Sequence, residues 1–169
     1  MRHTSAIVLY ARRPHRGLVK TRLAPLLGMD GALELHRAML LDSIGLLRRV
    51  SGETILPLVA FSEPATPPAG PDDPELAAAL AGLTLLPQRG IDLGDRLQAT
   101  FRSMFDRGFE RVVVFGSDSP TMPPERLRQA LTRLGADSEV VLHLAWGVGV
   151  LVEDHEGGSF HQRGGGLSV

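Results

Sequence analysis

The sequence contains no cysteine, and this absence removes several kinds of chemistry at once. Disulfide bonds, thiolate metal sites and cysteine nucleophiles are all excluded. Because a chain without disulfides suits a reducing compartment, we expect a cytoplasmic protein. No hydrophobic run approaches the roughly 20 residues that cross a bilayer, and the apolar run before Arg12 is too short for a signal peptide. We therefore expect no membrane partner.

The net charge is also small, and the sequence contains a single lysine. The formal net charge of the 169 residues is −1, so the chain lacks the general positive field that nucleic-acid binders use. We expect no nucleic-acid partner, and any anion binding must be local. Arginine supplies all but one of the 18 basic residues, and the exception is Lys20. Genomic base composition accounts for the excess of arginine, but the single lysine raises the question of what arginine could not do at that position.

The hydrophobic pattern alternates between short apolar runs and helical periodicity, which predicts an α/β fold. The expected strands are Ile7–Tyr10, Thr54–Phe61, Leu83–Pro87, Arg111–Phe115, Glu139–Leu144 and Gly147–Val152. Between them lie helical segments after Gly28, after Asp73, from Leu93 to about Gly108 and over Pro123–Leu134. Such alternation implies right-handed parallel crossovers and an open, doubly wound, mostly parallel sheet.

Three local features sharpen this prediction. Asp30, Asp73 and Asp92 each stand where a helix N-cap is expected. Pro57 cannot donate a ladder hydrogen bond, so it favours a sheet edge or an irregular segment for Thr54–Phe61. We expect one nucleotide-binding domain over residues 1–152 and a flexible, glycine-rich tail over residues 153–169.

The first candidate site is the segment that follows the first strand. Arg12, Arg16, Lys20 and Arg22 could neutralise phosphate oxygens, and Gly17 would let the backbone approach a ligand. The segment matches neither the Walker loop nor the dinucleotide fingerprint, so a solvated basic loop is an equal alternative on composition alone. Its place at the carboxyl end of a strand, where ligands bind in such sheets, favours a phosphate site.

The second candidate is Asp118, in the Gly-Ser-Asp-Ser-Pro turn after the most apolar strand. A rigid carboxylate there could bind a hard cation such as Mg²⁺ or Mn²⁺, although an aspartate in a turn near a proline often bonds only its own backbone. The third candidate is the segment with Asp92 and Arg96, where helix capping competes with anion binding at the helix N-terminus.

Taken together, three motifs resemble one known family. They are Ala11-Arg12-Arg13-Pro14 with Gly17 to Gly28, then Asp92-Leu93-Gly94-Asp95-Arg96, then Gly116-Ser117-Asp118-Ser119-Pro120. In this order they resemble the bacterial glycosyltransferase-A-like (GT-A-like) group named radical-SAM/selenodomain-associated transferases, over about residues 6 to 142. The resemblance implies the fold of nucleotide-diphospho-sugar transferases, with Lys20 and Arg22 on the phosphates and Asp118 on a divalent metal. Fold alone does not fix the reaction.

One departure from the family pattern lies near the end of the chain. Relatives carry an acidic residue and a Gly-Gly-aromatic pair after the last core strand, whereas His143–Val152 contains no carboxylate. Glu153 or Asp154 is a candidate substitute. We therefore hypothesise that the acceptor-binding part is truncated or altered at the C-terminus.

Two functions remain open on this basis. The first is a transferase that uses a nucleotide sugar or a nucleoside triphosphate as donor, an unknown acceptor, a divalent cation, and Lys20 and Asp118 as catalytic residues. The second is a nucleotide-binding module or an impaired remnant of such an enzyme. A dehydrogenase is disfavoured because no Gly-x-Gly-x-x-Gly turn follows the first strand.

Overall fold

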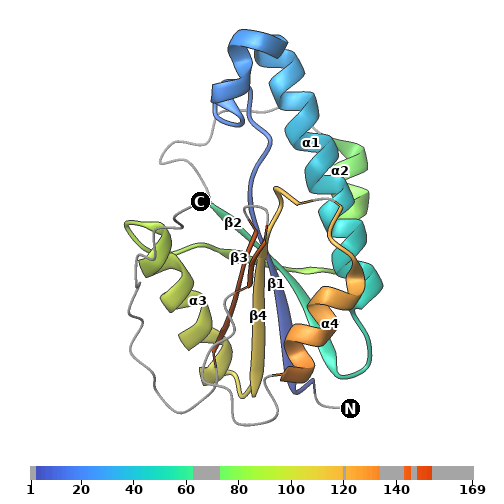
Figure 1. Ribbon diagram of the computed structural model, residues 1–169, viewed down its shortest axis with the longest axis vertical. Coiled ribbons are helices and arrows are strands. Elements are labelled where there is room, and N and C mark those ends of the chain that lie inside the picture. Colours follow the sequence, from blue (N-terminus) through green and yellow to red (C-terminus); the bar gives the residue numbers. More distant parts are fainter. Residues whose placement is uncertain (1–2, 63–72, 120, 134–142, 146–147, 154–169) are drawn as a thin grey trace.

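The computed structural model describes residues 3–62, 73–119, 121–133, 143–145 and 148–153. They form an α/β unit around one mixed sheet whose strand order is β3-β2-β1-β4-β6-β5 (Figure 1). The strands are β1 (Ser5–Arg12), β2 (Ile55–Ser62), β3 (Thr84–Pro87), β4 (Arg111–Gly116), β5 (His143–Ala145) and β6 (Val148–Glu153). The helices are the 3₁₀ turn η1 (Thr21–Leu23), α1 (Ala24–Val50), α2 (Pro74–Leu80), α3 (Leu93–Asp106) and α4 (Pro124–Arg133).

The first four strands are parallel, as the alternating pattern predicted. β1 pairs with β2 on one side and with β4 on the other, and β3 extends the sheet beyond β2. β6 runs antiparallel to β4, and β5 runs antiparallel to β6. The expected open, mostly parallel sheet is therefore confirmed. Residues 139–142 and 147 of the two last predicted strands lie outside the described residues.

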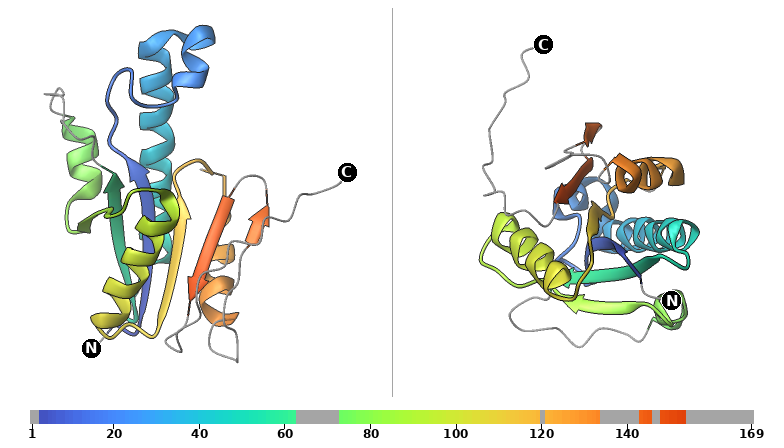
Figure 2. Two further views of the ribbon diagram at one scale, coloured as in Figure 1. Left: turned by 90° about the vertical axis from the view of Figure 1, so that its left-hand side faces the viewer. Right: turned by 90° about the horizontal axis from the view of Figure 1, so that it is seen from below.

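Helices cover both faces of the sheet, which explains why the central strands are continuous apolar runs. In Figure 2, α3 lies on one face, whereas α1, α2 and α4 lie on the other. Alternate residues of β1 divide between the two cores. Ile7 and Leu9 pack with residues of α1, α2 and α4, while Ala6 and Val8 pack with Phe101 and other residues of the α3 side.

Two of the three predicted N-caps are confirmed. The Asp73 carboxylate accepts the Leu76 N–H at 2.9 Å, and the Asp92 carboxylate accepts the Asp95 N–H at 2.9 Å. The prediction for Asp30 was wrong: Gly28, with the non-helical angles φ 72° and ψ 169°, interrupts α1, and helical geometry resumes directly after it. Asp30 lies inside this helix and its carboxylate binds Arg16 instead.

The position of Pro57 also corrects the sequence analysis. β2 is an interior strand, paired with both β1 and β3, rather than a sheet edge. However, β3 pairs only with Leu58 to Phe61. Pro57 precedes that stretch. No residue of β3 lies opposite it, so the missing N–H of the proline removes no hydrogen bond between β2 and β3.

Among the described residues, no helix combines the length and the apolar character needed to span a membrane.

Candidate functional site

The carboxyl ends of the parallel strands gather the predicted site residues at one end of the molecule. β1 lies between β2, to which its own crossover leads, and β4, to which the chain returns later. The edge between β1 and β4 is thus the topological switch point, where open α/β sheets bind ligands. The Ser117 N–H donates to the Tyr10 carbonyl at 3.2 Å, so the turn with Asp118 leaves the sheet beside the end of β1.

Lys20 and Asp118 meet at this switch point although 98 positions separate them in the sequence. The Lys20 ammonium donates to the Asp118 carboxylate, with Nζ 2.8 Å from Oδ1. The lysine side chain is largely covered, with 19% exposed, whereas 68% of the aspartate side chain is exposed. The structure therefore joins the only lysine to the aspartate predicted to bind metal, and leaves the carboxylate accessible from solvent.

The backbone of the loop after β1 determines where Lys20 points. Lys20 has φ 48° and ψ 34°, the left-handed conformation that side-chain-bearing residues seldom adopt. Its carbonyl accepts the Leu23 N–H at 2.8 Å, which closes η1. Gly17 also has a positive φ of 76°, and the neighbouring Val19 is buried. Gly17 thus serves the turn of the loop.

His36, which the sequence analysis did not single out, supports the same site from α1. It is buried, and its Nε2 lies 3.0 Å from the carbonyl oxygen of Arg12. Burial lowers the pKa of His36, and the positive charges of Lys20 and Arg12 lower it further, against opposing effects of the Arg12 carbonyl and of Asp118. A histidine at helical spacing gives no sequence signal for this role, because the contact depends on how α1 packs against β1.

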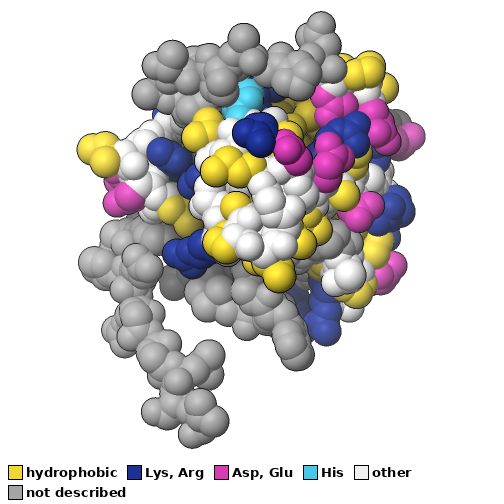
Figure 3. Space-filling model, turned by 90° about the horizontal axis from the view of Figure 1, so that it is seen from above, with side chains coloured by type: hydrophobic (Ala, Val, Ile, Leu, Met, Phe, Trp, Pro, Cys, Tyr) yellow, Lys and Arg dark blue, Asp and Glu magenta, His cyan; other side chains and the backbone are white. Residues whose placement is uncertain are grey.

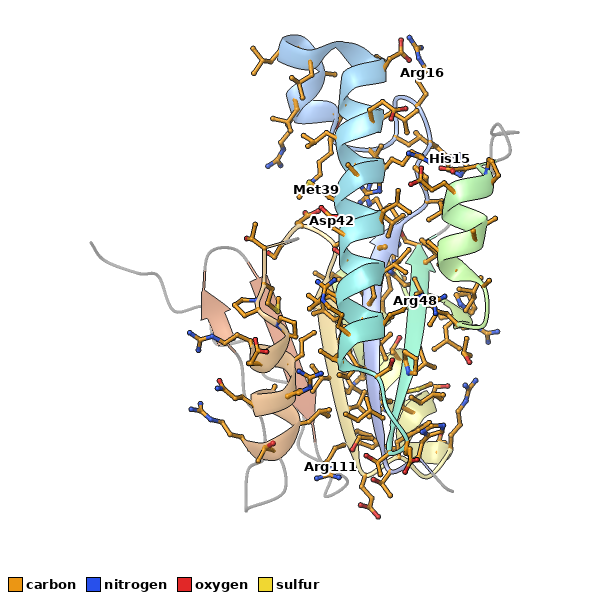
Figure 4. All side chains as sticks on the ribbon, turned by 90° about the vertical axis from the view of Figure 1, so that its right-hand side faces the viewer. His15, Arg16, Met39, Asp42, Arg48 and Arg111 are labelled. Carbon is orange, nitrogen blue, oxygen red and sulfur yellow. The ribbon has the colours of Figure 1, made fainter. Side chains whose placement is uncertain are left out.

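The guanidinium groups predicted to bind phosphate have different surroundings. Arg16 donates to Asp30 and lies at the outer end of α1, above His15 (Figure 4). The Arg16 guanidinium therefore contacts Asp30 and does not take part in the Lys20–Asp118 pair. The exposed side chains of Arg12 and Arg22 make no hydrogen bond or ion pair within the part of the chain that the structure describes. These two arginines are therefore available to an anion.

Seen from above, this end of the molecule is not uniformly basic. Figure 3 shows Lys and Arg side chains next to acidic and hydrophobic ones on this face. Leu26, Leu27 and Met29, near the start of α1, expose 83%, 43% and 50% of their surface. The local charge available to an anion therefore comes from a few cations at the loop rather than from an extended basic surface.

Asp92 and Arg96 belong to the opposite face of the sheet, at the N-terminus of α3. The Asp92 carboxylate caps the helix, while Arg96 Nε donates to the Gly90 carbonyl at 3.1 Å. The Tyr10 hydroxyl donates to the Arg96 carbonyl at 2.8 Å, which fixes the start of α3 against β1. The structure thus gives Asp92 and Arg96 structural partners and brings neither into contact with Lys20 or Asp118.

A divalent cation at the switch point would find few protein ligands among the described residues. No group of three or more His, Cys, Asp or Glu side chains suited to a metal occurs among the residues that the structure describes. Asp118 offers a carboxylate, and Mg²⁺ commonly binds through one or two carboxylates together with substrate phosphates and water. The residues thus fit a cation that arrives with a diphosphate better than a free ion.

Glu153, a candidate for the missing second carboxylate, lies at the wrong edge of the sheet. β6 runs antiparallel to β4 and places Glu153 beside Val112, near the start of β4. Asp118 follows the opposite end of that strand, roughly 15 Å or more away at about 3.3 Å per residue. The backbone of Glu153 therefore lies at the opposite end of β4 from Asp118, and Asp154 lies outside the described residues.

Comparisons with known proteins agree with this architecture. The model of the family DUF2064, described as an uncharacterized protein conserved in bacteria, matches residues 46–152, a segment that includes Asp118 but begins after Lys20. A crystal structure from Desulfovibrio desulfuricans G20, provisionally described as a nucleotide-diphospho-sugar transferase, is similar with a TM-score of 0.74 and 29% sequence identity. That similarity covers 90% of this chain and 64% of the other.

A second solved structure supports the fold alone. It is a cytidylyltransferase from Leptospira borgpetersenii serovar Hardjo-bovis (strain JB197), with a TM-score of 0.54 and 15% identity over 90% of this chain and 60% of that one. The chain thus spans less than two thirds of either protein's length. No curated protein gives a significant match. The fold is that of the nucleotide-diphospho-sugar transferases, as the motif resemblance implied.

Proposed function

The chain belongs to the bacterial protein family DUF2064, and on this premise we propose that it is a transferase that uses a nucleotide-activated donor. The group that moves is a glycosyl or a nucleotidyl group, and Mg²⁺ or Mn²⁺ is the cofactor. One observation carries the proposal: Lys20 and Asp118 meet at 2.8 Å at the switch point of a sheet with this fold. An ammonium and a carboxylate at that edge match the two charges of a metal diphosphate.

The proposed reaction needs positioning and charge neutralisation rather than a covalent intermediate on the protein. An acceptor oxygen forms the new bond to the transferred group, and the bond between that group and the phosphate oxygen of the leaving group breaks. The electron pair departs with the diphosphate or pyrophosphate, and the acceptor proton passes to solvent. Lys20 would stabilise the negative charge that develops on the leaving group, with Arg12 and Arg22 as further contacts for phosphate oxygens.

Asp118 would hold the divalent cation, which when bound supplies neutralising charge to the diphosphate. Its exposed carboxylate can turn towards an approaching ligand, while Ser117 anchors the turn to β1. Arg16 would have to leave its exposed ion pair with Asp30 before its guanidinium could contact a phosphate oxygen. Asp92 and Arg96 remain candidates for the nucleoside side of the donor, on the α3 face.

A nucleotide-binding module without turnover is the second candidate function. The backbone register of β6 favours it, because Glu153, the candidate for a second carboxylate, lies beside Val112 rather than near Asp118. Binding of the donor would then persist while transfer fails. Product analysis with a panel of acceptors separates the two functions.

The proposal is tested with a panel of sugar nucleotides and nucleoside triphosphates in the presence of Mn²⁺, by calorimetry on the wild-type protein and two variants. We expect Lys20→Ala and Asp118→Ala each to weaken donor binding in the presence of Mn²⁺ by about ten-fold or more, in line with the loss of a charge-assisted contact. Asp118→Ala should also remove the dependence on Mn²⁺. Arg107→Ala, at the far end of α3, removes an exposed cation as the control. Unchanged binding in both site variants would refute the site assignment.

A further inference from the structure

The ion pair at the switch point joins two groups that the proposed function assigns to different ligands. Lys20 would bind the phosphates and Asp118 the cation, yet Nζ and Oδ1 are 2.8 Å apart. Each group therefore already has a partner of opposite charge. A ligand that engages only one of them must break this contact and leave the other group without its partner.

The backbone shows that the pair is built into the loop. Among the described residues, Lys20 is the one non-glycine position with a positive φ. The 3₁₀ turn that starts there and the buried Val19 hold the loop in this shape. A left-handed conformation at a residue with a side chain costs free energy, so the surrounding contacts must hold the loop in the shape in which the ammonium contacts Asp118.

Simple electrostatics then ranks the possible ligands. A free divalent cation that approaches Asp118 meets the ammonium at close range, and a free diphosphate that approaches Lys20 meets the carboxylate. In each encounter the second group of the pair repels the ligand, and the described residues offer no group of three or more His, Cys, Asp or Glu side chains to offset the repulsion of the cation. A cation bound to a diphosphate presents both charges together and can replace both halves of the ion pair in one step.

We propose that the Lys20–Asp118 ion pair makes the site selective for the metal–diphosphate complex by competing with the free cation at Asp118 and with the free anion at Lys20. The proposal rests on the proposed function, since it assigns the same two residues to the same ligand. It also predicts the direction of two effects: Lys20 should weaken the binding of the free cation at Asp118, and Asp118 should weaken the binding of the free anion at Lys20. A site of two independent groups would show no such opposition.

The test uses the full chain, Mn²⁺ alone and inorganic pyrophosphate alone, followed in amide NMR spectra. Paramagnetic broadening of the Ser117 and Asp118 signals reports the cation, and shifts of the signals around Lys20 report the anion. Lys20→Met should raise the affinity for Mn²⁺ at least about five-fold, as expected when a unit charge near 4 Å is removed in a water-like dielectric. Asp118→Asn should raise the affinity for metal-free pyrophosphate by a similar factor.

Two controls carry matched charge changes elsewhere. Asp106→Asn removes an exposed carboxylate and Arg107→Met removes an exposed cation, both at the far end of α3. Neither should change the affinity for Mn²⁺ or for pyrophosphate by more than about two-fold, because exposed charges beyond a Debye length are screened. Urea unfolding of each variant establishes that it is folded.

The outcomes separate this inference from the proposed function. If Mn²⁺ and pyrophosphate together bind at Ser117 and Asp118 but Lys20→Met leaves the affinity for Mn²⁺ unchanged or lower, the competition is refuted and the proposed function stands. If the two ligands together produce no change at these residues in any variant, the proposed function fails as well. A rise in Mn²⁺ affinity in Lys20→Met with a rise in pyrophosphate affinity in Asp118→Asn supports the competition.

Discussion

Replacing Gly90 by alanine should disturb the turn that carries the α3 side of the site. Gly90 has φ 144°, a region that residues with a Cβ avoid. An added Cβ would lie 2.6 Å from the Cβ of Asp95, 2.7 Å from the backbone nitrogen of Arg96 and 2.8 Å from the carbonyl carbon of Asp95. Two of these three neighbours are backbone atoms of α3, so the first turn of the helix has to move.

Backbone strain and overpacking each cost about 1 to 3 kcal/mol, so Gly90→Ala should lower the free energy of unfolding by about 3 kcal/mol. With a urea m-value of about 2 kcal/mol/M, the unfolding midpoint should fall by about 1.5 M. The assay is urea denaturation followed by far-ultraviolet circular dichroism. Local loss of amide protection at Asp95 and Arg96 would identify the turn as the source.

Gly52→Ala is the matched control, because an added Cβ there meets nothing within 4 Å and its φ is not in the positive range. Its free energy of unfolding should stay within about 1 kcal/mol of the wild-type value. A Gly90→Ala protein as stable as the Gly52→Ala protein would refute the account of this turn.

Two further predictions concern pH. Because burial lowers the pKa of His36 in the folded state, the unfolded chain binds more protons below pH 6.5, so stability should fall as the pH drops from 7 to 5. His36→Gln should flatten that slope in urea unfolding at pH 5, 6 and 7, and an unchanged slope would contradict the burial of a neutral His36. Arg37 and the Leu76 N–H lower the pKa of Asp73 to about 2, so its stabilisation is present above pH 4 and lost between about pH 4 and 2. Asp73→Ala should cost about 1 to 2 kcal/mol at pH 7 and almost nothing near pH 2, by thermal unfolding; an equal loss at both pH values would contradict this pairing.

Hydrophobic periodicity was enough to predict most of the fold. The apolar run in β1 and the run Val112 to Phe115 in β4 are buried on both faces, so they carry the strongest strand signal in the chain. The caps at Asp73 and Asp92 are local hydrogen bonds between residues three apart, and for that reason sequence spacing alone predicted them.

The wrong predictions, for Asp30 and for the position of Pro57, concern features that depend on tertiary contacts. Asp30 has the right chemistry for a cap, but helical angles already resume directly after Gly28, and Arg16 binds the carboxylate. The interior place of β2 depends on the length of β3, which does not reach Pro57. Neither outcome is encoded within a window of neighbouring residues.

Some features of the candidate site could likewise be predicted from the sequence, and others depend on tertiary contacts. The placement of Lys20 and Asp118 at strand ends followed from the order of elements, and the structure brings the two side chains together. The partner of Arg16 and the role of His36 depend on the path of the loop after β1 and on the packing of α1, which periodicity does not describe. The same holds for Glu153, whose register with Val112 places it away from Asp118.

The most direct test of the central claim is a crystal of the protein soaked with Mn²⁺ and a set of nucleoside diphosphates and nucleotide sugars. Anomalous scattering locates the manganese without reference to the rest of the map. The account predicts a manganese peak at the Asp118 carboxylate, bridged to the diphosphate, with the Lys20 ammonium on a phosphate oxygen. A nucleotide bound at another edge of the sheet, with manganese away from Asp118, would contradict it.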